Sequence, residues 1–164
     1  GILAIIAGAL FAWIGGFADS RFGPKPVITG SIVVLTFVAI SIIFVSRQSV
    51  YGIPVASGSV LPDVTFYMFG AMIGAAGGII QAASRSMMVR QANPERMAES
   101  FGLYALAGKA TSFIAPLSIG VMTSWTQSQQ LGVTPLVVLF LLGLFLLCWV
   151  KPNGDGASWQ GSSD

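Results

Sequence analysis

The stretch GAMIGAAGGIIQAASRSMMVRQANPERMAESFGLYALAGKATSFIAP, residues 70–116, decides the fold of this 164-residue chain. In it two long apolar segments are joined by a short charged turn, residues 91–96. Each segment predicts a helix with one stripe of small and polar residues, because residues three or four apart share a helical face. The first stripe is Gly70, Gly74, Gly77, Gln81 and Arg85, and the second is Gly102, Ala105, Lys109, Ser112 and Pro116. Stripes of this kind in otherwise apolar helices need something other than lipid to face.

The composition is that of a membrane protein. Hydrophobic residues make up 54% of the chain and charged residues only 9%, against roughly 25% charged residues in soluble domains. Apolar runs of the roughly 17 to 25 residues that cross a hydrocarbon core recur along the chain. They are too long and too uniformly apolar for barrel strands, which alternate over about 10 residues. The sequence therefore predicts an all-α fold, a polytopic bundle of transmembrane helices.

Five spans are expected within a bundle of residues 1–151, at residues 1–18, 27–45, 65–88, 98–122 and 135–150. The first starts at Gly1 without an initiator Met or a charged n-region, which indicates a fragment that begins within or just before a span. Small residues recur in it, Gly8 and Gly15 among them, at a spacing that lets a neighbouring helix approach closely. Residues 46–64 are expected to form an outside loop. Residues 152–164, rich in Gly, Ser and Asp, are expected to form a disordered tail.

The cations at the helix ends predict the orientation in the membrane. Arg47 alone falls on one side, and the others fall on the side of the tail: Arg21, Lys25, Arg85, Arg90, Arg96 and Lys151. The positive-inside rule makes the tail side cytoplasmic. Because these cations are scattered at helix ends and do not form one basic patch, the net charge of +2 indicates no nucleic-acid partner. The expected surroundings are a lipid bilayer.

The residues that catalysis and metal binding need are scarce. The chain has no His and a single Cys, Cys148, which lies inside an apolar run. No spacing suggests a nucleophile with its base, a pair of catalytic carboxylates or a Walker loop. We therefore expect no enzyme activity, no metal and no cofactor.

Lys109 is the charge that lies deepest in a predicted span. It is about eleven residues into the span, or roughly 16 Å, which is close to the middle of a bilayer. An intramembrane charge costs at least about 2.5 kcal/mol and usually serves a site. One interpretation is that Lys109, with Ser112 on the same face, lines a pathway for a solute. The other is that Lys109 pairs with a carboxylate or with helix carbonyls and locks the bundle.

Two further groups are candidate functional residues. Arg85 lies about one turn from the cytoplasmic end of its span, and Gln81 lies one turn deeper on the same stripe. Together they suit a carboxylate or a phosphate, although Arg85 can also be an anchor for lipid headgroups. Asp19, Arg21 and Lys25 share the turn of residues 16–26. They form either a gate that favours one conformation of the bundle or a solvated surface pair worth about 0–1 kcal/mol.

Two parts of the sequence resemble a known family. The turn of residues 15–25 resembles the signature loop of the major facilitator superfamily, a Gly, an Asp and a basic, Gly-containing turn between two spans. More specific are GGIIQAASRS (77–86), the PER of the turn, AESFGLY (98–104) and GKA (108–110). They look like the branch of the superfamily that includes fungal vacuolar amino-acid effluxers and uncharacterised bacterial relatives.

The resemblance implies that the five spans match helices eight to twelve, part of the C-terminal six-helix half. The N-terminal half is then a missing partner, and the two halves alternate access to a substrate near the midplane. The resulting prediction is a secondary active or facilitative transporter fragment of the bacterial inner membrane that exports amino acids or similar small solutes. The alternative is a scaffold or receptor-like bundle without transport, whose polar stripes only hold helices together.

Overall fold

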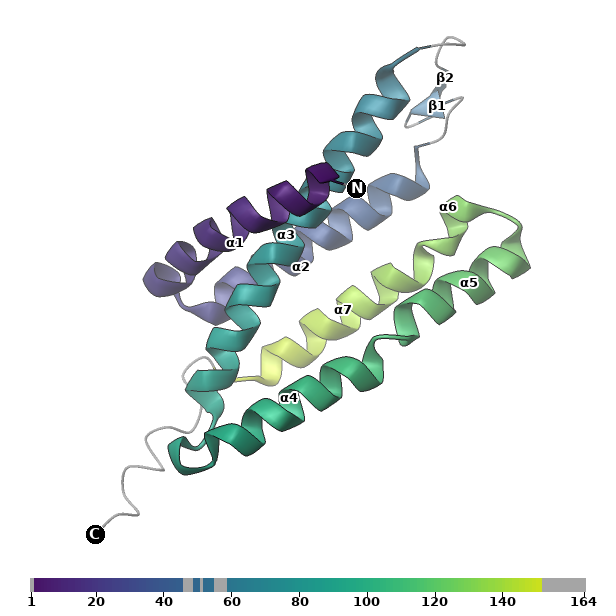
Figure 1. Cartoon of the computed structure of the whole chain (residues 1–164). Helices are drawn as coiled ribbons and strands as arrows, with labels where there is room; N and C mark the ends of the chain where they lie inside the picture. Colours follow the sequence, from purple (N-terminus) through teal and green to yellow (C-terminus); the bar gives the residue numbers. More distant parts are fainter. Residues whose placement is uncertain (1, 46–48, 51, 55–58, 152–164) are drawn as a thin grey trace.

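The computed structural model describes residues 2–45, 49–50, 52–54 and 59–151 (Figure 1). Residues 152–164, predicted to be a disordered tail, and much of the expected loop at 46–64 lie outside the described residues. The elements are α1 (Ile2–Phe22), α2 (Pro24–Ile43), β1 (Ser49–Val50), β2 (Ile53–Pro54), α3 (Leu61–Gln91), the 3-10 helix η1 (Pro94–Arg96), α4 (Met97–Thr111), α5 (Ile114–Thr126), α6 (Gln129–Gly132) and α7 (Thr134–Trp149). The two short strands pair antiparallel.

The helices confirm the predicted all-α transmembrane bundle. Four segments are long and apolar enough to cross a membrane, namely α2, α3, the stretch from η1 to α5, and the stretch from α6 to α7. α1 has 21 residues, so at 1.5 Å per residue it is about 32 Å long, which matches the hydrocarbon core of a bilayer. Figure 1 shows these helices running side by side along the length of the molecule.

Prolines set where two of the helices begin. Pro24 is the first residue of α2 and Pro62 the second of α3. A proline is tolerated in the first turn because the N–H that it lacks has no partner inside the helix there. The helices therefore begin at residues 24 and 61, earlier than the starts at 27 and 65 expected from the sequence. Gly23 separates α1 from α2 with a φ of 84°, a conformation that glycine adopts without strain.

α1 and α3 approach until their backbones touch. A Cβ added to Gly8 would lie 3.0 Å from the carbonyl oxygen of Gly74, and a Cβ added to Gly78 would collide with the backbone of Gly8. A Cβ on Gly15 would lie 3.0 Å from the side chain of Ile79. Small residues permit such an approach between apolar helices, which associate in lipid through close packing. The predicted close-packing role of Gly8 and Gly15 is confirmed.

α2 lies between α3 and α7. One buried cluster joins Ile28 of α2 to Ala83 and Met87 of α3, and Leu147 and Val150 pack against it. A second cluster at the other end of α2 joins Val38 and Val45 to Phe69 of α3. The described core is therefore formed by α2, α3 and α7, with α1 packed on α3.

Side chains tie both ends of α2 to the C-terminal part of the chain. At its start, Lys25 Nζ donates hydrogen bonds to the backbone carbonyls of Val150 (2.8 Å) and Cys148 (3.3 Å). Beyond its end, Gln130 Nε2 donates to the carbonyl of Val45 at 2.6 Å. The last carbonyls of a helix have no partner within the helix, and a cation complements its C-terminal dipole. Lys25 thus stabilises the end of α7.

Lys25→Met is expected to loosen the end of α7. The substitution keeps the length of the side chain but removes bonds from a charged donor, so it should lower the free energy of unfolding by about 1–2 kcal/mol. Thermal unfolding in detergent and hydrogen exchange of the last-turn amides of α7 would measure the effect. Arg90→Met is the control, because Arg90 is exposed in the last turn of α3. Equal effects of the two substitutions would show that the bonds of Lys25 contribute nothing.

The fourth expected span is divided. The sequence indicated one helix over 98–122, whereas α4 ends at Thr111 and α5 begins at Ile114. Pro116 accounts for the break, because it has no N–H to donate to the carbonyl of Ser112, four residues earlier. The backbone N–H and the Oγ of Ser112 both donate to the carbonyl of Lys109, at 3.3 and 2.8 Å. The helix therefore closes three residues after Lys109.

Candidate functional site

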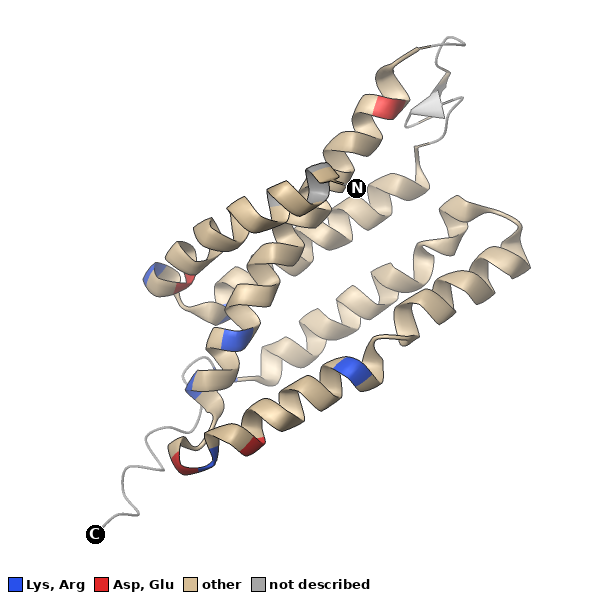
Figure 2. Cartoon of the chain, in the orientation of Figure 1, with Lys and Arg blue, Asp and Glu red and all other residues tan. Residues whose placement is uncertain are grey.

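Lys109 lies in the last turn of α4, directly before the break. It is twelve residues after Met97, the first residue of α4, or about 18 Å along the helix axis. Its side chain is exposed, and within the described part of the chain its ammonium makes no hydrogen bond or ion pair. Figure 2 shows charges where α3 turns into α4 and where α1 turns into α2, an acid near the start of α3, and one cation far along α4 from the α3–α4 turn. Among the described residues, the structure therefore places an exposed cation without a side-chain partner next to the break in the helix.

The break between α4 and α5 leaves backbone N–H and C=O groups near Lys109 without partners in a helix. A continuous helix satisfies its own N–H and C=O groups, whereas the end of α4 leaves carbonyls and the start of α5 leaves N–H groups without helical partners. In membrane transporters, such discontinuous helices supply backbone groups and helix dipoles for binding solutes and ions near the midplane. Lys109 and the first turn of α5 are both positive in character. Together they can attract an anionic group.

The predicted stripe of α3 is split between two surroundings. Gly74 turns toward α1, where it contacts Gly8. At Gly70 and Gly77 an added Cβ would meet no atom within 4 Å. Gln81 and Arg85 are exposed. The polar part of the stripe is therefore exposed in the described chain.

A hydroxyl pair that sequence reasoning missed sets the register of α3 against α4. Ser84 Oγ and Tyr104 Oη are 2.8 Å apart. Ser84 is seven residues before the end of α3 and Tyr104 is seven after the start of α4. Their equal distance from the turn was the available signal, since antiparallel neighbours joined by a short turn meet at matching positions.

Gln81 and Lys109 lie at similar distances from the turn, along two helices that diverge from it (Figure 1). Gln81 is ten residues from the end of α3 and Lys109 is twelve from the start of α4, which correspond to about 15 and 18 Å. Arg85 is six residues from the end of α3, or about 9 Å. The two helices therefore carry polar groups at two levels, with Gln81 and Lys109 in the deeper one and Arg85 nearer the turn. Ser112 lies just beyond Lys109, and its hydroxyl donates a hydrogen bond to the backbone carbonyl of Lys109 at the end of α4.

The three residues of the expected gating loop have separate surroundings. Asp19 is only 8% exposed, and its Oδ1 has no hydrogen-bond partner among the described residues. Arg21 is exposed, with its guanidinium carbon 6.0 Å from the centre of the Phe22 ring. Lys25 is bonded to the end of α7. No ion pair joins the acid to either cation within residues 2–45.

The position of Asp19 is unfavourable for a carboxylate by itself. It lies in the last turn of α1, where the helix dipole repels negative charge. A buried polar atom without a hydrogen bond also loses its hydration without compensation. By contrast, Glu99 in the first turn of α4 complements that helix and lies 3.8 Å from exposed Arg96. We therefore expect the carboxylate of Asp19 to bind a hydrogen-bond donor or a cation that lies outside the described residues.

Comparisons with known proteins agree with this architecture. The sequence model of a family described as "vacuole effluxer Atg22 like" matches residues 2–154. The uncharacterized MFS-type transporter YxiO of Bacillus subtilis (strain 168) is 26% identical over 145 residues, which are 88% of this chain and 30% of that protein. The chain thus spans less than a third of the length of this curated relative. No solved structure matches the chain.

These findings define an integral membrane protein of the class of MFS-type transporters, represented by part of its C-terminal half. The chain belongs to the family described as "vacuole effluxer Atg22 like". The resemblance that the sequence indicated is confirmed.

Proposed function

We propose that this chain is part of a secondary transporter that exports amino acids or similar small solutes by alternating access. The description of the family as effluxers supports export. The observation that carries the proposal is the break between α4 and α5 beside Lys109, at mid-depth in a span. A helix broken at this depth and carrying an unpaired cation is typical of substrate sites in transporters.

In this mechanism the deeper polar level binds the substrate. The ammonium of Lys109 and the first turn of α5 attract the carboxylate of an amino acid, and Gln81 on α3 supplies an amide that can donate and accept hydrogen bonds. Ser112 holds the end of α4 closed and so positions Lys109. Arg85, about 9 Å from the turn, forms a second station for the carboxylate nearer the membrane surface.

The proposed partner is the N-terminal half of the transporter. In the stretch Pro94–Thr126, no residue of the most apolar 18-residue segment is buried within this chain. α4 and α5 therefore present faces that helices outside this chain would cover, completing the pathway between them. The proposed location is the bacterial inner membrane with the C-terminus in the cytoplasm. Arg21, Lys25, Arg85, Arg90 and Arg96 support this orientation under the positive-inside rule.

A flux measurement tests the proposal. The complete protein would be reconstituted in liposomes loaded with labelled amino acids, and efflux would be followed with and without an ion gradient. Substrate-dependent efflux that saturates, and that excess unlabelled solute reduces, is the expected result. Absence of flux for every amino acid and small organic solute tested, from protein shown to be folded, would favour the scaffold.

Asp19→Asn is expected to change the balance between open states of the complete protein. We expect Asp19 to find a donor in the rest of the protein when the cytoplasmic side is closed, so loss of its charge should favour the state open to the cytoplasm. A coupling of ordinary size would change the ratio of states by about fivefold or more. Thiol labelling of Gly77→Cys, in a protein without other cysteines, would measure the ratio.

Asp63→Asn is the matched control for this substitution. Asp63 is an exposed acid in the first turn of α3, at the opposite end of the bundle from Asp19. The Asp63→Asn substitution should leave the thiol labelling of Gly77→Cys unchanged. An unchanged ratio in Asp19→Asn would mean that the carboxylate has no part in gating.

A further inference from the structure

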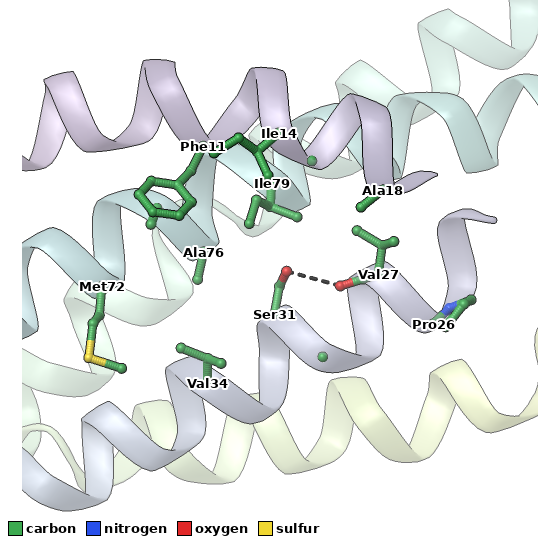
Figure 3. Close-up of a pocket in the computed structure, with 13 residues that line it drawn as sticks. Phe11, Ile14, Ala18, Pro26, Val27, Ser31, Val34, Met72, Ala76 and Ile79 are labelled. Carbon is green, nitrogen blue, oxygen red and sulfur yellow. Dashed lines mark hydrogen bonds between the residues drawn. The ribbon is translucent and has the colours of Figure 1, made fainter. Parts of the chain in front are cut away.

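A cavity of about 490 Å³ that is open to the surface of the molecule lies between α1, α2 and α3 (Figure 3). The side chains of Phe11 and Ile14 from α1, Val34 from α2, and Met72 and Ile79 from α3 line it. Its volume lies in the range of about 300–1,000 Å³ found for small-molecule sites. The cavity is separate from the polar stripes of α3 and α4 that form the proposed substrate pathway.

The packing of the three helices explains why the cavity is there. α1 is held against α3 by the contacts of Gly8 with Gly78 and of Gly15 with Ile79. α2 is held against α3 by buried clusters toward its two ends. Between these contacts the walls carry small residues, namely Gly15, Ala18, Gly30, Ala75 and Ala76. The hollow is therefore fixed by contacts on both sides of it.

The walls offer an occupant no free polar side chain. Ser31 is the one hydroxyl among the residues that line the cavity, and its Oγ donates to the carbonyl of Val27 at 2.9 Å (Figure 3). Apolar cavities exclude water, because a water molecule needs two to four polar partners. An apolar solute would be accepted. In a bundle of membrane-spanning helices, the apolar molecules at hand are the acyl chains of the bilayer.

A charge three residues beyond the last α1 residue of the cavity wall indicates which kind of lipid would bind. Phe11, Ile14 and Ala18 line the cavity from one face of α1, and Arg21 continues that face because it follows Ala18 by three residues. Arg21 is exposed, and no acid pairs with it in the described part of α1 and α2. It lies in the turn that carries helix-end cations, which under the positive-inside rule faces the leaflet rich in anionic lipids.

We propose that this cavity binds one acyl chain of an anionic phospholipid whose phosphate is held by Arg21. A guanidinium binds a phosphate through two parallel charge-assisted hydrogen bonds. The acyl chain fills the space between α1 and α2 and so supports their separation at the cavity. The site is independent of the proposed transport and can be tested by binding alone.

Photolabelling of the complete protein in nanodiscs tests the proposal. The probe is phosphatidylglycerol with a photoreactive diazirine in one acyl chain, and labelled residues are located by mass spectrometry. We expect the label to concentrate on Phe11, Ile14, Val34 and Met72. Label spread evenly over lipid-facing helices, or absent from these residues because other parts of the protein fill the cavity, would overturn the proposal.

Two glycines provide a matched pair of variants. Gly30 lines the cavity and an added Cβ would meet no atom within 4 Å, so Gly30→Leu introduces a bulky side chain at a wall position where its Cβ is accommodated. It should reduce cavity labelling to background. Gly143 on α7 is equally open but lies outside the cavity, so Gly143→Leu should leave the labelling unchanged. Equal labelling of the two variants would contradict the site.

Arg21→Gln tests the headgroup contact. Removing one cation near an anionic bilayer surface should lower the preference for phosphatidylglycerol over phosphatidylcholine by about fivefold. Labelling of the cavity at saturating probe should persist, because the acyl site is intact. An unchanged lipid preference would mean that Arg21 does not hold the phosphate.

Discussion

Lys109→Met in the complete protein is expected to lower transport by at least about 30-fold, with normal insertion and an unchanged melting temperature. Methionine keeps the length of the side chain and removes its charge. If Lys109 holds the carboxylate of the substrate, the variant leaves that carboxylate unpaired in a desolvated site, a loss of at least about 2 kcal/mol. Flux in proteoliposomes and thermal unfolding in detergent are measured on the same preparation.

The two roles of Lys109 give opposite patterns in these measurements. A pathway residue loses flux and keeps stability, whereas a structural lock shows aggregation or a clear fall in melting temperature. Lys109→Arg keeps the charge and should retain part of the activity. Thr111→Val is the matched control, since Thr111 is an exposed neighbour whose hydroxyl bonds only to carbonyls of its own helix. Wild-type flux in Lys109→Met for all solutes would remove Lys109 from the pathway.

Gly78→Ala is expected to prevent the normal packing of α1 on α3. The added methyl group would collide with the backbone of Gly8, and backbone atoms cannot move aside as the end of a flexible side chain can. Overpacking costs about 1–3 kcal/mol and occasionally more. Because this contact is between two backbones, we expect a loss of about 3 kcal/mol, visible as a lower melting temperature and a low yield of folded protein.

Gly77→Ala, at the neighbouring glycine, is the control for the Gly78→Ala prediction. A Cβ at Gly77 would meet no atom within 4 Å. Gly77→Ala should therefore be neutral or slightly stabilising, because alanine favours a helix by about 1 kcal/mol over glycine. The two variants differ by one position in the same helix, so composition and propensity are matched. Similar melting temperatures for both would show that α1 does not contact α3 through Gly78.

Local properties of the chain made the helices predictable. The low charge content and long apolar runs required backbone groups to be satisfied within helices, since lipid offers no hydrogen bonds. The small residues Gly8 and Gly15 indicated a close helix contact, which α3 supplies. Residues 77–86 and 98–104 carried the family resemblance. Each of these signals depends on neighbouring residues in the sequence, so no knowledge of the tertiary structure was needed.

The helix ends were less well predicted, although their cause is also local. α2 and α3 begin near prolines that their first turns accommodate. Pro116 breaks the fourth span at Ser112, where the sequence had indicated a continuous helix. A proline within a helix removes the hydrogen bond to the carbonyl four residues before it, which here is the carbonyl of Ser112. This rule was available from the sequence, but it does not say whether a helix bends or divides.

By itself the sequence determined the class of fold and the membrane as its solvent, and it predicted Lys109 to be a charge at mid-depth. Only the tertiary structure decided which surfaces meet. It turned Gly74 toward α1 while leaving Gln81 and Arg85 exposed, and it joined Lys25 to the end of α7. It left the Oδ1 of Asp19 without a hydrogen-bond partner among the described residues. It also left the cavity between α1 and α2. The physical reason is that hydropathy and helix formation arise from nearby residues, whereas the rotation and separation of helices arise from contacts between residues distant in the chain.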